Sequence, residues 1–177
     1  MEIEGQLVDV INREIYPARL ISENGKIKAI ERIENAPDKY LCPGFVDAHI
    51  HIESSMLVPS RFAAEAVKHG TLATVSDPHE IANVCGIEGI HFMIQDSKKV
   101  PFEFCFGAPS CVPATSFETS GAELNSNAIE RILEMEDIHY LSEMMNYPGV
   151  IFEDKEVLRK IDLALKKNMK VDGHAPG

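Results

Sequence analysis

Apolar runs typical of β-strands alternate with segments typical of helices from residue 41 onward. We predict strands at residues 45–51, 71–76, 102–106, 139–143 and 169–173. Strands that alternate with helices form parallel βαβ units, because each helix returns the chain to the start of the next strand. A complete (β/α)8 TIM-like barrel has eight such units in about 250 residues. We therefore predict an α/β fold in which residues 43–177 form the N-terminal half of such a barrel.

Residues that favour helix ends support the predicted helices. Pro59 is suited to an early position of a helix that ends near residue 69. Asp154 is a suitable N-cap for a helix that continues to about residue 167. The helix over residues 80–97 is less strongly supported, because it contains two glycines.

Residues 1–42 contain short strand-like runs without helical segments between them. We predict strands at residues 6–11, 18–21 and 26–30. Asn24 and Gly25 connect the last two, and Asn-Gly is a strong hairpin signal because both residues tolerate positive φ. Three short strands cannot build a core alone. We therefore predict that residues 1–42 are one part of a small β-domain.

Two histidines stand at the end of the first predicted strand of the α/β region, His49 and His51. Side chains two residues apart point to the same face of a strand, so the two imidazoles project together while Ile50 faces the other way. Such a pair can bind one metal ion, although a pair of surface histidines is the alternative. The apolar run before the pair and the clusters at the other strand ends favour the metal site.

Polar residues also follow three other predicted strands. Asp77, His79 and Glu80 follow the second strand, Glu143 ends the fourth, and His174 follows the fifth. In a (β/α)8 barrel the active site lies at the C-terminal ends of the strands. Imidazoles and carboxylates are the ligands of metal centres that activate water, and one carboxylate can bridge two ions. Glu143 is therefore the candidate bridge between two metals, with a solvated strand-end carboxylate as the alternative. His174 is a candidate ligand, with an ordinary loop histidine as the alternative.

Three other residues near these strand ends have open assignments. Asp77 either caps the following helix or reaches the cavity as a substrate contact. His79 and Glu80 are candidate groups near the metal or the substrate. Glu53 directly follows the histidine pair, so it could contact a metal ligand or the substrate.

The composition argues against several classes of partner. The formal net charge of −11, from 17 basic and 28 acidic residues, disfavours nucleic acid and anionic membrane surfaces. The apolar runs are shorter than the roughly 18 residues of a transmembrane segment. The four cysteines lack the spacing of a structural zinc site. We therefore expect a cytoplasmic protein that binds neither nucleic acid nor membrane.

Several stretches of the sequence resemble a known family. Residues 43–51, PGFVDAHIH, resemble the first-strand signature of the amidohydrolase superfamily. A closer resemblance, to the adenine deaminases of bacteria and archaea, is carried by residues 52–56 (IESSM), 76–83 (SDPHEIAN), 109–114 (PSCVPA) and 141–146 (LSEMMN). The resemblance extends through the whole chain.

This resemblance implies a fold, a reaction and a metal site. The fold is a (β/α)8 barrel with a flanking β-sandwich domain, and the reaction is hydrolytic deamination of adenine to hypoxanthine and ammonia. The site is binuclear and holds Mn²⁺ or Fe²⁺, with Zn²⁺ as a further option. By position, His49 and His51 bind the first metal, Glu143 bridges, and His174 binds the second. The fourth strand has no lysine of the kind that relatives such as dihydroorotase carboxylate, which favours the deaminase branch.

The resemblance also places a further metal-binding histidine and a proton-accepting aspartate beyond Gly177. We therefore expect little or no activity from the 177 residues alone. Glu80 or His79 could assist protonation of the purine. We also expect the protein to form a homo-oligomer. Two alternatives remain at this point: an amidohydrolase that acts on a cyclic amide, and a non-catalytic, association-prone chain.

Overall fold

The computed structural model describes residues 1–115 and 117–174. The chain divides into two compact units, Met1–Gly44 and Phe45–Gly177. Within the described residues, no helix is both long enough and apolar enough to cross a membrane.

The first unit is a four-stranded sheet. Its strands are β1 (Glu2–Asp9), β2 (Glu14–Glu23), β3 (Lys26–Arg32) and β4 (Tyr40–Leu41), in the order β3-β2-β1-β4. β1 and β3 pair with β2 in antiparallel fashion, and β4 lies parallel to β1. The turn at Asn24 and Gly25 has φ values of 52° and 74°, which confirms the predicted hairpin.

The ends of β1 differ from the sequence-based prediction, because β1 begins at Glu2 and ends at Asp9. Backbone pairing with β2 holds the polar first residues of the chain in the sheet, which an apolar pattern does not reveal. Leu7 and Ala18 are buried, whereas Ile11 and Ile15 are exposed.

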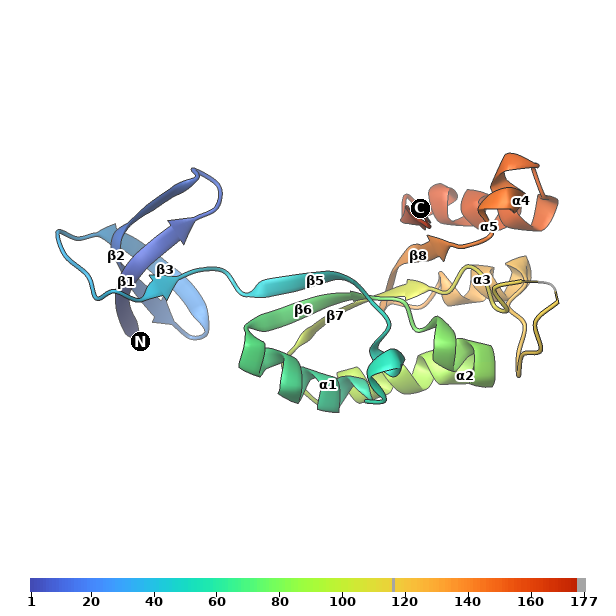
Figure 1. Ribbon diagram of the computed structural model, residues 1–177, viewed down its shortest axis with the longest axis horizontal. Coiled ribbons are helices and arrows are strands. Elements are labelled where there is room, and N and C mark those ends of the chain that lie inside the picture. The colour runs from blue at the N-terminus through green and yellow to red at the C-terminus, as the bar shows by residue number, and fades with distance from the viewer. Residues whose placement is uncertain (116, 175–177) are drawn as a thin grey trace. The chain divides into compact units, whose positions relative to one another are not determined.

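The second unit is built on a five-stranded parallel sheet. Its strands are β5 (Phe45–Ile50), β6 (Thr71–Ser76), β7 (Glu103–Ala108), β8 (Ile138–Met144) and β9 (Lys170–Gly173), paired in sequence order. Each pair is parallel, and each crossover adds the next strand on the same side of the last. The sheet therefore curls, as Figure 1 shows for β5 to β8. The predicted parallel α/β arrangement is confirmed.

Helices connect the strands. They are the 3-10 turns Ile52–Ser55 and Val67–His69 and the α-helices α1 (Pro59–Ala66), α2 (His79–Ser97), α3 (Ser126–Ile132), α4 (Tyr147–Ile151) and α5 (Lys155–Lys166). The side chain of Asp154 accepts a hydrogen bond from the Val157 backbone N–H at 3.0 Å, so it caps α5 as predicted. α2 continues across Gly86, whose φ of 60° and ψ of −142° mark a kink there.

The hydrophobic core of the second unit lies where the helices pack on the sheet. Its largest fully buried side chains include Phe106, Ile90, Ile129, Ile132 and Leu141, from β7, α2, α3 and β8. This apolar layer anchors the strands from one side, so that the polar residues at their C-terminal ends are held in fixed positions.

Candidate metal centre

The structure brings the predicted strand-end residues together. His49 lies in β5 and His51 directly follows it, Glu143 lies near the end of β8, and His174 follows β9. Since neighbouring parallel strands end at the same edge of a sheet, residues far apart in the sequence become neighbours.

The carboxylate of Glu143 lies among three imidazoles. Its Oε1 is 3.5 Å from His49 Nε2 and 3.2 Å from His51 Nε2, and its Oε2 is 2.7 Å from His174 Nδ1. The Nε2 atoms of His49 and His51 are 3.3 Å apart. The Glu143 side chain is only 9% exposed, so its carboxylate is largely shielded from solvent and contacts the three rings instead.

Contacts on the far side of the two rings set which nitrogen carries the proton. His51 Nδ1 is 3.0 Å from the backbone oxygen of Asp77. A carbonyl oxygen only accepts, so Nδ1 donates, and the neutral ring turns its Nε2 lone pair toward Glu143. His49 Nδ1 is similarly placed, 3.3 Å from Asp172 Oδ2. Both Nε2 atoms are therefore free to bind a metal ion.

The donor set fits a divalent cation. Two lone pairs that face each other at 3.3 Å, beside a carboxylate, repel unless a proton or a cation lies between them. One ligand atom from each of His51, Asp77, His79 and Glu143 lies within 4.8 Å of the others. Imidazole nitrogen with carboxylate oxygen suits zinc, iron and manganese.

The charge state of Glu143 suits a metal ligand. Burial raises the pKa of its carboxyl, but the hydrogen bond with His174 and the electrostatic influence of the neighbouring imidazoles outweigh burial. These neighbours hold the pKa of Glu143 below its usual value, so the carboxylate is ionised at neutral pH.

Asp77 and His79 form a contact of their own at the start of α2. His79 Nδ1 is 3.2 Å from Asp77 Oδ2, and the Asp77 side chain is 3% exposed. Burial lowers the pKa of His79, but the hydrogen bond to Asp77 and nearby carboxylates outweigh it and raise the pKa. The possibility that Asp77 caps the helix is wrong, because the residue at the N-cap is Pro78 and no side chain caps the helix there.

Glu53 and Glu80 lie beside this pair and hold the first turn of α2. Glu53 Oε1 accepts a hydrogen bond from Ile81 N at 3.1 Å, and Glu80 Oε1 accepts one from Ser54 Oγ at 2.9 Å. The second carboxylate oxygen of each is buried and, among the described residues, has no hydrogen-bond partner. Burial raises the pKa of Glu53.

Sequence reasoning missed the residues that support this cluster from outside. Asp172 contacts His49, and its position two residues before His174 was the only signal for it. Ser110 Oγ donates a hydrogen bond to the backbone oxygen of Glu143 at 2.5 Å, and Lys160 Nζ donates one to Ser110 O at 2.9 Å. These bonds connect the loop after β7 and helix α5 to the end of β8.

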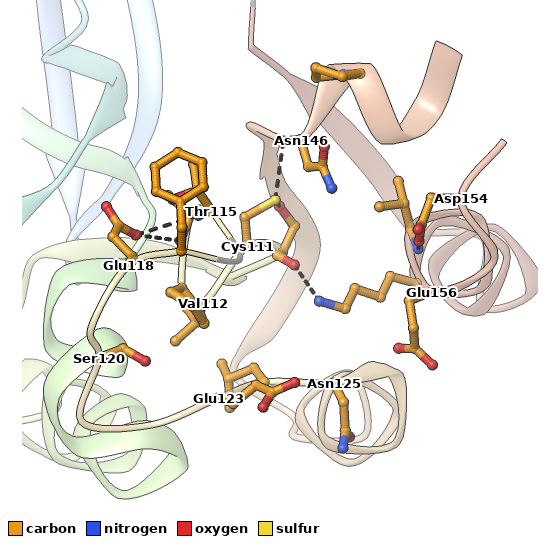
Figure 2. A pocket seen from close by; sticks show the side chains of 18 residues that line it. Cys111, Val112, Thr115, Glu118, Ser120, Glu123, Asn125, Asn146, Asp154 and Glu156 are labelled. Atoms are coloured by element: carbon orange, nitrogen blue, oxygen red, sulfur yellow. Dashed lines mark hydrogen bonds between the residues drawn. The ribbon is translucent and has the colours of Figure 1, made fainter. Parts of the chain in front are cut away.

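A pocket of about 690 Å³ lies among the loops that follow β7 and β8 and the start of α5 (Figure 2). Figure 2 shows Asp154 and Glu156 on one side of it and Glu118 on the other. These carboxylates accept hydrogen bonds from nearby backbone N–H groups. His49, His51, Glu143 and His174 are not among the described residues that line the pocket.

Comparison with known proteins identifies the family. Residues 40–177 match the Amidohydrolase family, and the chain belongs to it. The resemblance that the strand-end motifs predict is therefore confirmed at the level of the family.

Similar proteins are named adenine deaminases. That of Borreliella burgdorferi is 58% identical over 178 residues, which cover 99% of this chain and 32% of the relative. That of Sulfurovum sp. is 59% identical over 177 residues, 100% of this chain and 33% of the relative. That of Methanosarcina mazei is 57% identical over 173 residues, 98% of this chain and 31% of the relative. The chain spans about a third of the length of these curated relatives.

Proposed function

We propose that this chain supplies the first metal-binding part of an enzyme that hydrolyses adenine to hypoxanthine and ammonia. The observation that carries the proposal is the convergence of His49, His51 and His174 on the buried carboxylate of Glu143. The substrate comes from the named activity of relatives at 57–59% identity, and the hydrolytic chemistry from membership of the Amidohydrolase family.

The proposed cofactor is a pair of divalent ions, Mn²⁺ or Fe²⁺, with Zn²⁺ as a further option. His49 and His51 would hold one ion, His174 the other, and Glu143 would bridge them. Divalent ions at such a site lower the pKa of water toward neutrality and so supply hydroxide at neutral pH. The backbone oxygen of Asp77 and the carboxylate of Asp172 orient the two ligand rings.

The remaining polar groups would act on the substrate. We propose that Glu80 or His79 moves a proton at the purine, because both lie beside His51. Glu53 and Asp77 were expected to contact the substrate, and each has a buried oxygen free for a further partner.

The fold proposal extends the observed sheet. We propose that β5 to β9 are the first five strands of a (β/α)8 barrel, and that residues 1–42 contribute strands to a flanking β-sandwich. The relatives have about three times the length of the chain, which leaves room for three more strands. Exposed Phe45, Val46 and Leu72 near the β5 edge support association with further polypeptide, and a homo-oligomer is proposed.

The test is a chimera in which this chain replaces the matching third of the Sulfurovum enzyme. We expect the metal-loaded chimera to release ammonia from adenine, and the 177 residues alone to do so far more slowly or not at all. Substitution Glu143→Gln should abolish turnover, whereas His91→Gln, at an exposed position of α2, should not. Turnover of cyclic amides without turnover of adenine would favour the alternative amidohydrolase and contradict the substrate assignment.

A further inference from the structure

We propose that Asp77 and His79 bind a divalent cation together with His51 and Glu143, at a subsite that uses neither His49 nor His174. Since Nε2 is the one nitrogen of His51 left to bind a metal, this subsite is occupied in place of the ion held by His49 and His51, not together with it. This goes beyond the proposed deamination, which requires ions only at the ligands carried by β5, β8 and β9. It assigns Asp77 the role of a cation ligand in place of the substrate contact expected from the sequence, and it leaves Glu80 as the candidate for proton transfer whenever His79 binds the cation.

The spacing of the four residues is close to that of a metal site. One ligand atom from each lies within 4.8 Å of the other three. Ligand atoms about 2.0–2.2 Å from one ion lie at most about 4.4 Å apart, so a small inward movement completes the coordination. His79 Nδ1 is already 3.2 Å from Asp77 Oδ2, and His51 Nε2 is 3.2 Å from Glu143 Oε1. The rings of His51 and His79 meet edge to face, with centroids 4.5 Å apart.

A buried oxygen without a partner points independently to a ligand. Asp77 is 2% exposed, and its Oδ1 has no hydrogen-bond partner among the described residues. A buried carboxylate oxygen is stable only with a hydrogen-bond donor or a cation beside it. Oε2 of Glu53 and Oε2 of Glu80 are also buried without a described partner.

The local charge favours a cation for the same reason. The carboxylates of Glu53, Asp77 and Glu80 gather around the start of α2, and each has a buried oxygen without a described hydrogen-bond partner. The imidazoles of His51 and His79 lie beside them. A bound divalent ion would offset this negative charge and hold the start of α2 against the strand ends.

The local sequence explains how two ligands come from one short segment. Asp77 directly follows the last residue of β6, and His79 is the first residue of α2. Pro78 between them has φ −83° and ψ 43°, which breaks the strand before the helix begins. The side chains of Asp77 and His79 can therefore face the same point, which a continuous helix does not allow for residues two apart.

Zinc titration of the 177-residue chain tests the proposal, with the ring nitrogens of its seven histidines followed by long-range proton–nitrogen NMR. We expect a ring nitrogen of His79 to shift to the metal-bound range together with one of His51. Loss of a group that only orients a ligand weakens metal binding about 10–100-fold, so His79→Gln should weaken zinc binding at this site by more than about 100-fold. His91→Gln, on the same helix, should leave it unchanged. Unshifted His79 resonances at zinc saturation would overturn the proposal.

Crystals of the zinc-loaded chimera give a second measurement that needs no substitution. We expect an anomalous peak within bonding distance of both Asp77 and His79. Peaks confined to His49, His51, Glu143 and His174 would overturn the proposal. Neither experiment uses adenine, so each can be interpreted even if the deaminase assignment is wrong. In the same way, failure of this proposal would not contradict the deaminase assignment.

Discussion

Gly107 allows β7 to lie close to β8, and Gly107→Ala therefore tests the packing that positions Glu143. A Cβ added at this glycine would lie 2.2 Å from Ser142 Oγ and 2.6 Å from Tyr140 Cζ. Favourable contacts between such atoms lie near 3.5 Å, so both approaches are too short by about an ångström. Ser142 is fully buried and Tyr140 is 7% exposed, so neither side chain can move aside freely. Overpacking of this kind costs about 1–3 kcal/mol, and we expect about 3.

Urea unfolding followed by circular dichroism measures this loss of stability. Gly173→Ala is the matched control, because no atom of the described residues lies within 4 Å of its added Cβ, and we expect no loss of stability there. Ser142→Ala removes the nearer of the two clashing atoms, so the double variant with Gly107→Ala should recover part of the loss. A Gly107→Ala chain as stable as the original would refute the reasoning.

Three other substitutions test the cap, the acid response and the metal site. Asp154→Ala removes the cap of α5 and should lower the free energy of unfolding by about 1 kcal/mol. The control Asp162→Ala removes an exposed ion pair with Lys166 and should lower it by only about 0.3–0.5 kcal/mol. Urea unfolding of the two variants measures both effects. Burial raises the pKa of Asp96, but its hydrogen bonds outweigh burial and bring the pKa below 3.8. Its contribution to stability is thus present above about pH 4 and lost as the pH falls through the folded-state pKa. The stability difference between the original chain and Asp96→Asn should therefore shrink below pH 4, and a constant difference in unfolding experiments would contradict this. Zinc at 100 times its dissociation constant should stabilise the chain by about 2.7 kcal/mol in thermal unfolding, and Glu143→Gln should remove most of that gain.

The strands and the ligand positions of the second unit were predictable because local patterns encode them. The five strands of the parallel sheet were each expected within a few residues of their observed bounds. Asp154 was expected to cap α5 and does so. His49, His51, Glu143 and His174 were expected at strand ends, and parallel topology alone brings such residues to one edge of the sheet.

Features that depend on contacts between distant segments were not predictable. Helix α4 (Tyr147–Ile151) was not predicted, because its five residues include Pro148 and Gly149 and are too few to show a helical pattern. The apolar character of Cys85 favours burial, but the side chain is exposed, one residue before the kink at Gly86 in α2. The contact of Asp172 with the ring of His49 depends on the position of β9 relative to β5, which the local sequence does not encode.

The most direct test of the central claim is to measure bound metal and ammonia release from adenine together, in the chimera and in its Glu143→Gln variant. If the strand ends form a metal-dependent deaminase site, turnover rises in proportion to bound metal, and the variant loses both. Turnover that persists after the metal is removed, or metal that stays bound in the variant at full stoichiometry, would contradict the account.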